Sequence, residues 1–187
     1  MEPVTGPSTV HFSPSGAFTL EITVYSSGPD SWNYSRGIVK EVSNGKVIAD
    51  VLRNLAGFWF TWVLIEDREY LLCGEDCQRY NVIDLACANN VVTFPPEAYQ
   101  GRGFRWGTAY PSPNGRFIAV EGCYWAGSND LVVYDFSDPM ASPLPEVARV
   151  DDILRAKSWL NDHEFVYIVE DGDDKKQLIW RAPMGAP

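Results

Sequence analysis

The chain of 187 residues is long enough for one domain with a hydrophobic core, and its 45% of hydrophobic residues excludes a disordered chain. Asp and Glu outnumber Lys and Arg by 25 to 15, which gives a net charge of -10 at pH 7. A negative field repels phosphate backbones, so we expect no nucleic-acid partner. The same field attracts basic protein surfaces.

The N-terminal residues, from Met1 to His11, contain neither the basic cluster nor the apolar core of a signal peptide. The longest apolar run, from Phe58 to Ile65, is interrupted by Thr61. This run is much shorter than the ~20 residues that a membrane helix requires. We therefore expect a cytoplasmic protein without membrane contacts.

Four segments repeat one pattern: an apolar or aromatic entry, a polar turn, an aromatic residue and an apolar run that ends near an acid. They cover residues 12–21, 62–73, 110–121 and 159–170. The aromatic residues after the turns, Phe18, Tyr70, Phe117 and Phe165, are 52, 47 and 48 residues apart. A nearly constant spacing of about 40–50 residues is typical of propeller blades. The pattern predicts an all-β, propeller-like fold of about four antiparallel meander blades, with a β-sandwich as the alternative.

Further strand signals lie within each interval. The apolar runs 37–42 and 46–52 flank Ser43-Asn44-Gly45, which is a hairpin signal, and the runs 80–85 and 91–94 flank Asn89-Asn90. Residues 131–136 and 177–181 predict strands of the later repeats. Helical periodicity is nearly absent, and the best helix candidate is 150–159, which Asp151 and Asp152 could cap.

One repeat resembles a known family. Ser112-Pro113-Asn114-Gly115, with the apolar run to Val120 and the segment 130–135, is similar to a blade of the WD40-like propeller repeat, which carries a Ser-Pro-Asp-Gly-Lys turn. Ser13-Pro14-Ser15-Gly16 matches this turn in part, 161–164 is a more diverged version, and no Trp-Asp dipeptide closes a repeat.

The repeats imply a single propeller-like domain over 1–187, with units at approximately 8–54, 57–99, 103–150 and 153–183. One sheet cannot bury both of its faces alone, so the units are expected to stack. Three arrangements are open: a closed four-bladed ring, an open arc, or a homodimer that completes a larger ring.

Two turn-rich loops contain large aromatic side chains. Trp32 and Tyr34 lie in the segment 28–36, and Tyr124 and Trp125 lie at the equivalent place in the third repeat. Loops of a propeller emerge on its rim, so these four residues, with Glu121 before the second loop, are the predicted binding surface. An alignment of the two repeats pairs Glu121 with Glu21.

The absence of a reactive motif favours a non-enzymatic module that binds another protein, such as an inhibitor or a scaffold. The sequence contains no P-loop, dinucleotide fingerprint or Gly-x-Ser-x-Gly elbow, so we predict no cofactor. A sensor for a small molecule or glycan remains an alternative. Another is a propeller enzyme that uses carboxylates at the strand ends. Those carboxylates are Glu21, Glu75, Glu121 and Glu170.

Cysteine and histidine spacing predicts no metal site. Cys73 and Cys77 are separated by three residues, and paired Cys-x2-Cys units are absent. Buried thiols are expected, with a Cys73–Cys77 disulfide as the alternative. His11 and His163 are isolated in the sequence and are expected to be structural.

Overall fold

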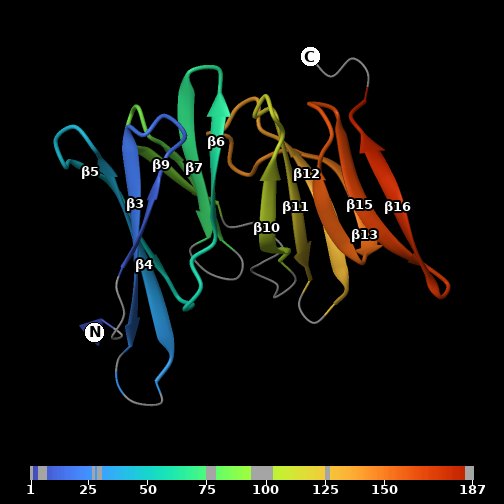
Figure 1. Cartoon of the computed structure of the whole chain (residues 1–187), viewed down its shortest axis with the longest axis horizontal. Coiled ribbons are helices and arrows are strands. Elements are labelled where there is room, and N and C mark those ends of the chain that lie inside the picture. The colour runs from blue at the N-terminus through green and yellow to red at the C-terminus, as the bar shows by residue number, and fades with distance from the viewer. Residues whose placement is uncertain are drawn as a thin grey trace. The chain divides into compact units, whose positions relative to one another are not determined.

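The computed structural model describes residues 2–3, 8–26, 28, 31–74, 79–93, 103–124 and 127–183. Contacts divide the chain into two compact units, which we call the N-terminal unit (Met1–Thr93) and the C-terminal unit (Phe94–Pro187). Each unit contains two antiparallel sheets (Figure 1). The prediction of one domain over 1–187 stays a prediction.

The N-terminal unit holds the first and second sheets. In the first sheet, β3, β4 and β5 are consecutive neighbours, and β1 and β2 both pair with β3. Its strands are β1 (Glu2–Pro3), β2 (Thr9–Phe12), β3 (Phe18–Ser26), β4 (Asn33–Glu41) and β5 (Val47–Arg53). The second sheet is a meander of β6 (Phe60–Ile65), β7 (Arg68–Gly74), β8 (Tyr80–Asp84) and β9 (Asn89–Thr93).

The C-terminal unit holds the third and fourth sheets, which are also meanders. The third sheet contains β10 (Arg105–Pro111), β11 (Phe117–Cys123), β12 (Asn129–Asp135) and β13 (Glu146–Ile153). The fourth contains β14 (Arg155–Trp159), β15 (Glu164–Asp171) and β16 (Asp174–Arg181). The prediction of about four antiparallel meanders is confirmed. In the described part of the chain there is no helix long and apolar enough to cross a membrane.

Two local predictions are wrong. The helix expected at 150–159 is the end of β13 followed by β14, because Val150 pairs with Leu131 and the sheet satisfies the backbone groups. The turn expected at Asn89-Asn90 begins earlier, and both residues belong to β9. Ala88 takes the left-handed conformation there, at φ 53°.

The Ser-Pro-x-Gly turns form as predicted. Gly16 and Gly115 have φ values of 74° and 73°, which favour glycine. Ser13 N donates to Phe18 O at 2.9 Å, and Ser112 N donates to Phe117 O at 2.8 Å. These turns therefore occupy equivalent places in the first and third sheets.

The two faces of each sheet can be distinguished by backbone hydrogen bonding. Along a central strand, the backbone groups of successive residues bond alternately to the two neighbouring strands. Because the residues are all L, the residues that bond to one neighbouring strand have their side chains on one face of the sheet, and the residues that bond to the other neighbouring strand have theirs on the opposite face. We define the faces from the second strand of each meander. Residues of this strand whose backbone bonds to the first strand have their side chains on the front face. Residues whose backbone bonds to the third strand have their side chains on the back face. Phe18 and Phe117 are front residues by their bonds to Ser13 and Ser112.

The core residues of the second and fourth sheets lie on the back faces of these sheets. Glu69 O accepts from Leu85 N beside the third strand, so Glu69, Leu71 and Cys73 lie on the back face of the second sheet. Ile168 O accepts from Leu154 N beside the first strand, which places Phe165 and Tyr167 on the back face of the fourth.

One core lies within each unit, and both cores join a front face to a back face. In the N-terminal unit, Leu20, Val39 and Val51 of the first sheet pack with Leu71, Cys73 and Ile83 of the second. In the C-terminal unit, Phe117, Ala119 and Leu131 of the third sheet pack with Phe165 and Tyr167 of the fourth. The post-turn aromatics Phe117 and Phe165 thus lie on opposite faces of their sheets, although sequence spacing aligned them.

Carboxylates also tie each pair of sheets. The buried Glu69 accepts hydrogen bonds from Ser13 Oγ at 3.0 Å, Ser15 N at 2.7 Å and Ser15 Oγ at 2.6 Å. In the C-terminal unit, Asp162 Oδ1 accepts from Asn114 N at 2.9 Å. In both units the third residue of the Ser-Pro-x-Gly turn donates its N–H to a carboxylate of the next sheet.

Gly37 provides a test of the packing around the connection between β5 and β6. A Cβ at Gly37 would lie 2.4 Å from Cζ of Phe58 and 3.0 Å from Cδ1 of Leu20, so Gly37→Ala must displace packed groups. We expect Gly37→Ala to lower the free energy of unfolding by about 1–3 kcal/mol in urea titration. Gly57→Ala is the control, because nothing lies within 4 Å of its Cβ position. Equal stability of both variants would contradict this packing.

Candidate functional site

Trp32 stands at the edge of a hollow in the N-terminal unit. The side chain is 62% exposed, and its Nε1 donates to Asn54 O at 3.1 Å. The hollow has a volume of about 500 Å³. It is lined by Ser31, Trp32, Asn33, Arg53, Leu55, Ala56 and Gly57. An exposed indole held by a hydrogen bond is a preorganised apolar platform.

Short polar contacts hold both walls of this hollow. Ser26 Oγ and Ser31 Oγ lie 2.6 Å apart, and both hydroxyls donate to Gly28 O, at 2.8 and 2.7 Å. On the other wall, Ser35 Oγ donates to Leu55 O at 2.7 Å. The hydroxyls therefore fix the backbone on either side of Trp32.

Arg53 is one of the residues that line the hollow. Its side chain is nearly buried, and the guanidinium carbon lies 5.9 Å from the centroid of the Trp59 ring. Trp59 in turn lies against Gly74, where a Cβ would be 2.2 Å from its Nε1. The guanidinium is therefore packed against the Trp59 ring in the wall of the hollow.

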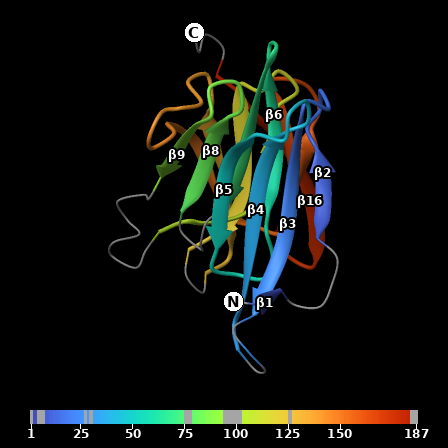
Figure 2. The ribbon, with the colours of Figure 1, turned by 90° about the vertical axis from the view of Figure 1, so that its left-hand side faces the viewer.

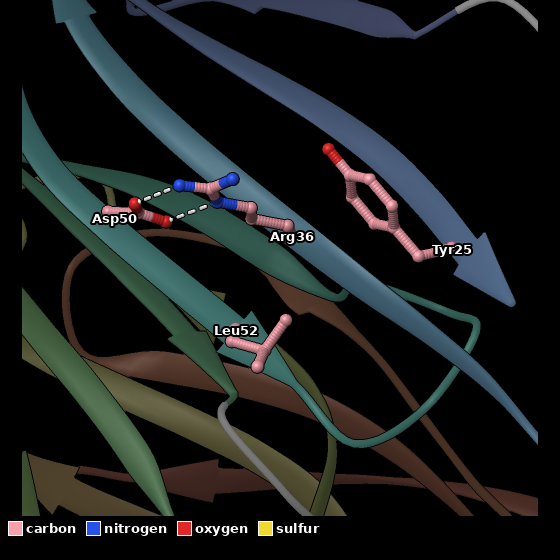
Figure 3. Close-up of a pocket in the computed structure, with 4 residues that line it drawn as sticks. All are labelled: Tyr25, Arg36, Asp50 and Leu52. Carbon is pink, nitrogen blue, oxygen red and sulfur yellow. Dashed lines mark hydrogen bonds and ion pairs between the residues drawn. The ribbon is translucent and has the colours of Figure 1, made fainter. Parts of the chain in front are cut away.

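Tyr34 lies on the back face of the first sheet, directly opposite Tyr25 on β3. Beside this pair, a second hollow of about 460 Å³ is lined by Tyr25, Arg36, Asp50 and Leu52 (Figure 3). Arg36 forms a two-pronged ion pair with Asp50, with Nε donating to Oδ1 at 2.8 Å. These hydrogen bonds, together with the attraction between the charges, lower the pKa of Asp50 and raise that of Arg36.

Tyr124 belongs to a different cluster in the C-terminal unit. Its ring centroid lies 5.6 Å from that of Phe104, and the Arg149 guanidinium lies over both rings, at 5.1 and 5.4 Å. Glu146 holds Arg149 by two hydrogen bonds, at 3.0 and 2.7 Å, which raise the pKa of Arg149. Trp125 lies outside the described residues. The aromatic rim formed by all four residues therefore stays a prediction.

Two of the predicted carboxylates, Glu21 and Glu121, make structural contacts. Glu21 accepts from Lys40 Nζ at 2.7 Å, and Glu170 is exposed at the end of β15. Glu75 lies outside the described residues. Glu121 Oε2 accepts from Ala156 N of β14 at 3.0 Å, and its Oε1 accepts from Asn129 at 3.3 Å. Burial, with a contribution from the Glu121 charge, raises the pKa of nearby Tyr110.

The alignment of Glu21 with Glu121 is wrong by one residue. Thr9 pairs with Ile22 in the first sheet, and Thr108 pairs with Glu121 at the equivalent place in the third. Glu121 is therefore equivalent to Ile22. A shift of one residue moves a side chain to the other face of a sheet, so Glu21 lies on a back face and Glu121 on a front face.

Glu121 is expected to stabilise the C-terminal unit through its bond to Ala156. Glu121→Ala leaves this N–H without its acceptor and should cost about 1–3 kcal/mol of unfolding free energy. Glu121→Gln keeps an acceptor oxygen and should recover most of that loss. Urea unfolding of both variants, with the exposed Glu170→Ala as control, measures the difference. If Glu121→Ala and Glu170→Ala changed the free energy of unfolding equally, the structural role of Glu121 would be contradicted.

The remaining candidates are the cysteines and the histidines. Cys73 is buried, whereas Cys87 is exposed and Cys123 is half-buried, so the expectation of buried thiols is wrong for Cys87. Cys77 lies outside the described residues. The His11 ring centroid lies 4.8 Å from that of Phe60, whereas His163 is exposed and its backbone N–H donates to Asn161 Oδ1. No cluster of three or more His, Cys, Asp or Glu suited to a metal ion occurs within the described ranges.

Sequence reasoning missed the walls of both hollows. The segment 54–57 contributes backbone and small side chains, for which the sequence gives no signal. The face with Arg36 and Asp50 could have been found, because Thr19, Glu21, Thr23 and Tyr25 alternate with buried or half-buried apolar residues along β3.

Comparison with known proteins gives one similar sequence and several similar folds. No family model matches the chain. An uncharacterised protein, R762 of Acanthamoeba polyphaga mimivirus, is 33% identical over 168 residues, which cover 86% of this chain and 66% of that protein. The chain therefore spans slightly less than two thirds of that relative's length.

The solved structures that resemble the chain include β-propellers. The β-propeller domain of Myceliophteria thermophila Cps50 (Swd1) matches 94% of this chain with a TM-score of 0.53 and 13% identity. The dihydro-heme d1 dehydrogenase NirN matches 97% of this chain with a TM-score of 0.55 and 14% identity. The matches cover 51% and 40% of those chains, so this chain spans about half of their length or less. The chain thus has a propeller-like fold, and at these identities the likeness extends to the fold alone.

Proposed function

We propose that the protein is a non-enzymatic module that binds another protein through Trp32 and the adjoining hollow. The observation that carries this proposal is the exposed indole, which its hydrogen bond to Asn54 O holds beside a hollow of about 500 Å³. A fixed aromatic side chain loses little conformational freedom on binding, and Trp is enriched among residues that dominate interface energies.

The net charge of the chain indicates what kind of protein surface it binds. A net charge of -10 favours encounter with a basic surface and opposes encounter with an acidic one. Repeated β-sheets also present interaction surfaces by construction, and the Ser13–Gly16 and Ser112–Gly115 turns support an origin from diverged WD40-like repeats. A basic inhibitor target or assembly partner fits these properties.

A small polar ligand such as a glycan is the second candidate occupant. The same hollow combines the Trp32 ring with the polar side chains of Ser31 and Asn33. An aromatic platform beside hydrogen-bonding groups is the usual composition of a small-molecule site.

Trp32→Ala tests the protein-binding proposal. Partners are captured from a lysate with the full chain, identified by mass spectrometry, purified, and titrated against each variant. We expect Trp32→Ala to weaken binding of a basic partner by at least about 10-fold, as for a central interface residue.

Val47→Ala is the matched control, because Val47 is exposed on the β4–β5 hairpin of the same unit. Equal binding by Trp32→Ala and Val47→Ala would reject the Trp32 surface. Binding of an oligosaccharide that depends on Trp32, without a protein partner, would instead select the second candidate.

A further inference from the structure

The first sheet has a back face that no sheet of the N-terminal unit covers. Figure 2 looks onto this side, where β2, β3, β4 and β5 run next to one another. Its apolar side chains include Val10, Phe12 and Leu52, which are 53%, 63% and 47% exposed. Val10 and Phe12 lie on β2 and Leu52 lies on β5, and the charged pairs Lys40–Glu21 and Arg36–Asp50 lie on the same face, so this exposed face is of mixed polarity, like many protein interfaces.

The fourth sheet has a front face that no sheet of the C-terminal unit covers. Its back face packs on the third sheet, and its front face carries the half-buried Ile168 on β15 and Ile179 on β16, beside the buried Val166. Leu160, 57% exposed, continues this face at the hairpin, where its N–H donates to Glu164 O.

The two packings within the units define which faces fit together. The front face of the first sheet packs on the back face of the second, and the front face of the third packs on the back face of the fourth. Four faces are not covered by a sheet of the same unit: the back of the first sheet, the front of the second, the back of the third and the front of the fourth. Leu72 on the front of the second sheet and Ile118 on the back of the third are fully buried, whereas the back of the first sheet and the front of the fourth carry exposed apolar side chains. A contact between these two exposed faces would again join a front face to a back face, as in both units. One face can therefore pack on the other with the sheet twist found within the units.

Charge does not oppose such a contact. On the first sheet, Lys40 pairs with Glu21 at 2.7 Å, and Arg36 pairs with Asp50. On the fourth sheet, Arg181 pairs with Glu164 at 2.8 Å, and Lys175 stands opposite Glu170. The fourth-sheet face also carries Arg155 opposite Ile168, so neither face has a surplus of negative charge.

We infer that the back face of the first sheet binds the front face of the fourth sheet of a second copy of this chain. The contact is heterologous, since each copy contributes a different face. The three-stranded fourth sheet limits the contact to roughly 800 Å² of total buried surface, which is the range of weak, concentration-dependent association.

Complementation between two variants tests this inference on the purified full chain. Leu52→Asp disables the first-sheet face, and Ile179→Asp disables the fourth-sheet face, with the exposed Gln177→Asp as a second variant that leaves packing intact. Light scattering across micromolar concentrations should show copies associating in the wild type, and single copies of each variant alone. An equimolar mixture of Leu52→Asp with Ile179→Asp, or with Gln177→Asp, should form heterodimers, because one intact contact remains.

Val92→Asp is the matched control, because Val92 is 45% exposed on the outer strand of the second sheet, and this variant should associate like the wild type. Persistent association of both Ile179→Asp and Gln177→Asp would show that first sheets pair with each other, and would overturn the inference. A wild type that stays single at every concentration would also overturn it.

Discussion

The packing of one sheet face on the next is the interaction on which the rest of the structure depends. A β-sheet of half-apolar strands cannot hide both faces alone, and burial of apolar surface contributes about 25 cal/mol per Å². In each unit the front face of one sheet meets the back face of the following sheet, and nearly all of the buried side chains in the two cores lie at these contacts. The hollow beside Trp32 and the charged back face of the first sheet are consequences of where this packing ends.

Polar contacts make the packing specific. Apolar side chains alone would permit sheets to slide, because dispersion contacts have little direction. The bonds of Glu69 to Ser13 and Ser15, and of Asp162 to Asn114, join the turn of one sheet to the hairpin of the next. Trp159 adds a directed bond from Nε1 to Tyr110 O at 2.8 Å. These contacts set the register between sheets and thereby the shape of the exposed loops.

The repeat spacing predicted the four meanders because strands, turns and their order are local properties of the chain. The faces of the sheets were not predictable from that spacing, since hairpins of different length change which aromatic residue points into the core. Phe117 follows a turn opened by Ser112, whereas Phe165 follows a shorter hairpin opened by Leu160, and the two rings lie on opposite faces. The exposure of Trp32 followed from its loop, but the carbonyl of Asn54 that holds it depends on tertiary contacts.

The connection between β5 and β6 also constrains how the sequence can change during evolution. Phe58 lies over Gly37 of the first sheet, and the next residue, Trp59, lies over Gly74 of the second. Each ring occupies the volume that a side chain would take at its glycine, so homologues with a larger residue at either glycine should carry a smaller one at the facing aromatic position. The two pairs share one short segment, and an insertion between Phe58 and Trp59 would break both at once. Length variation should therefore accumulate in the exposed β4–β5 hairpin and be rare in this connection.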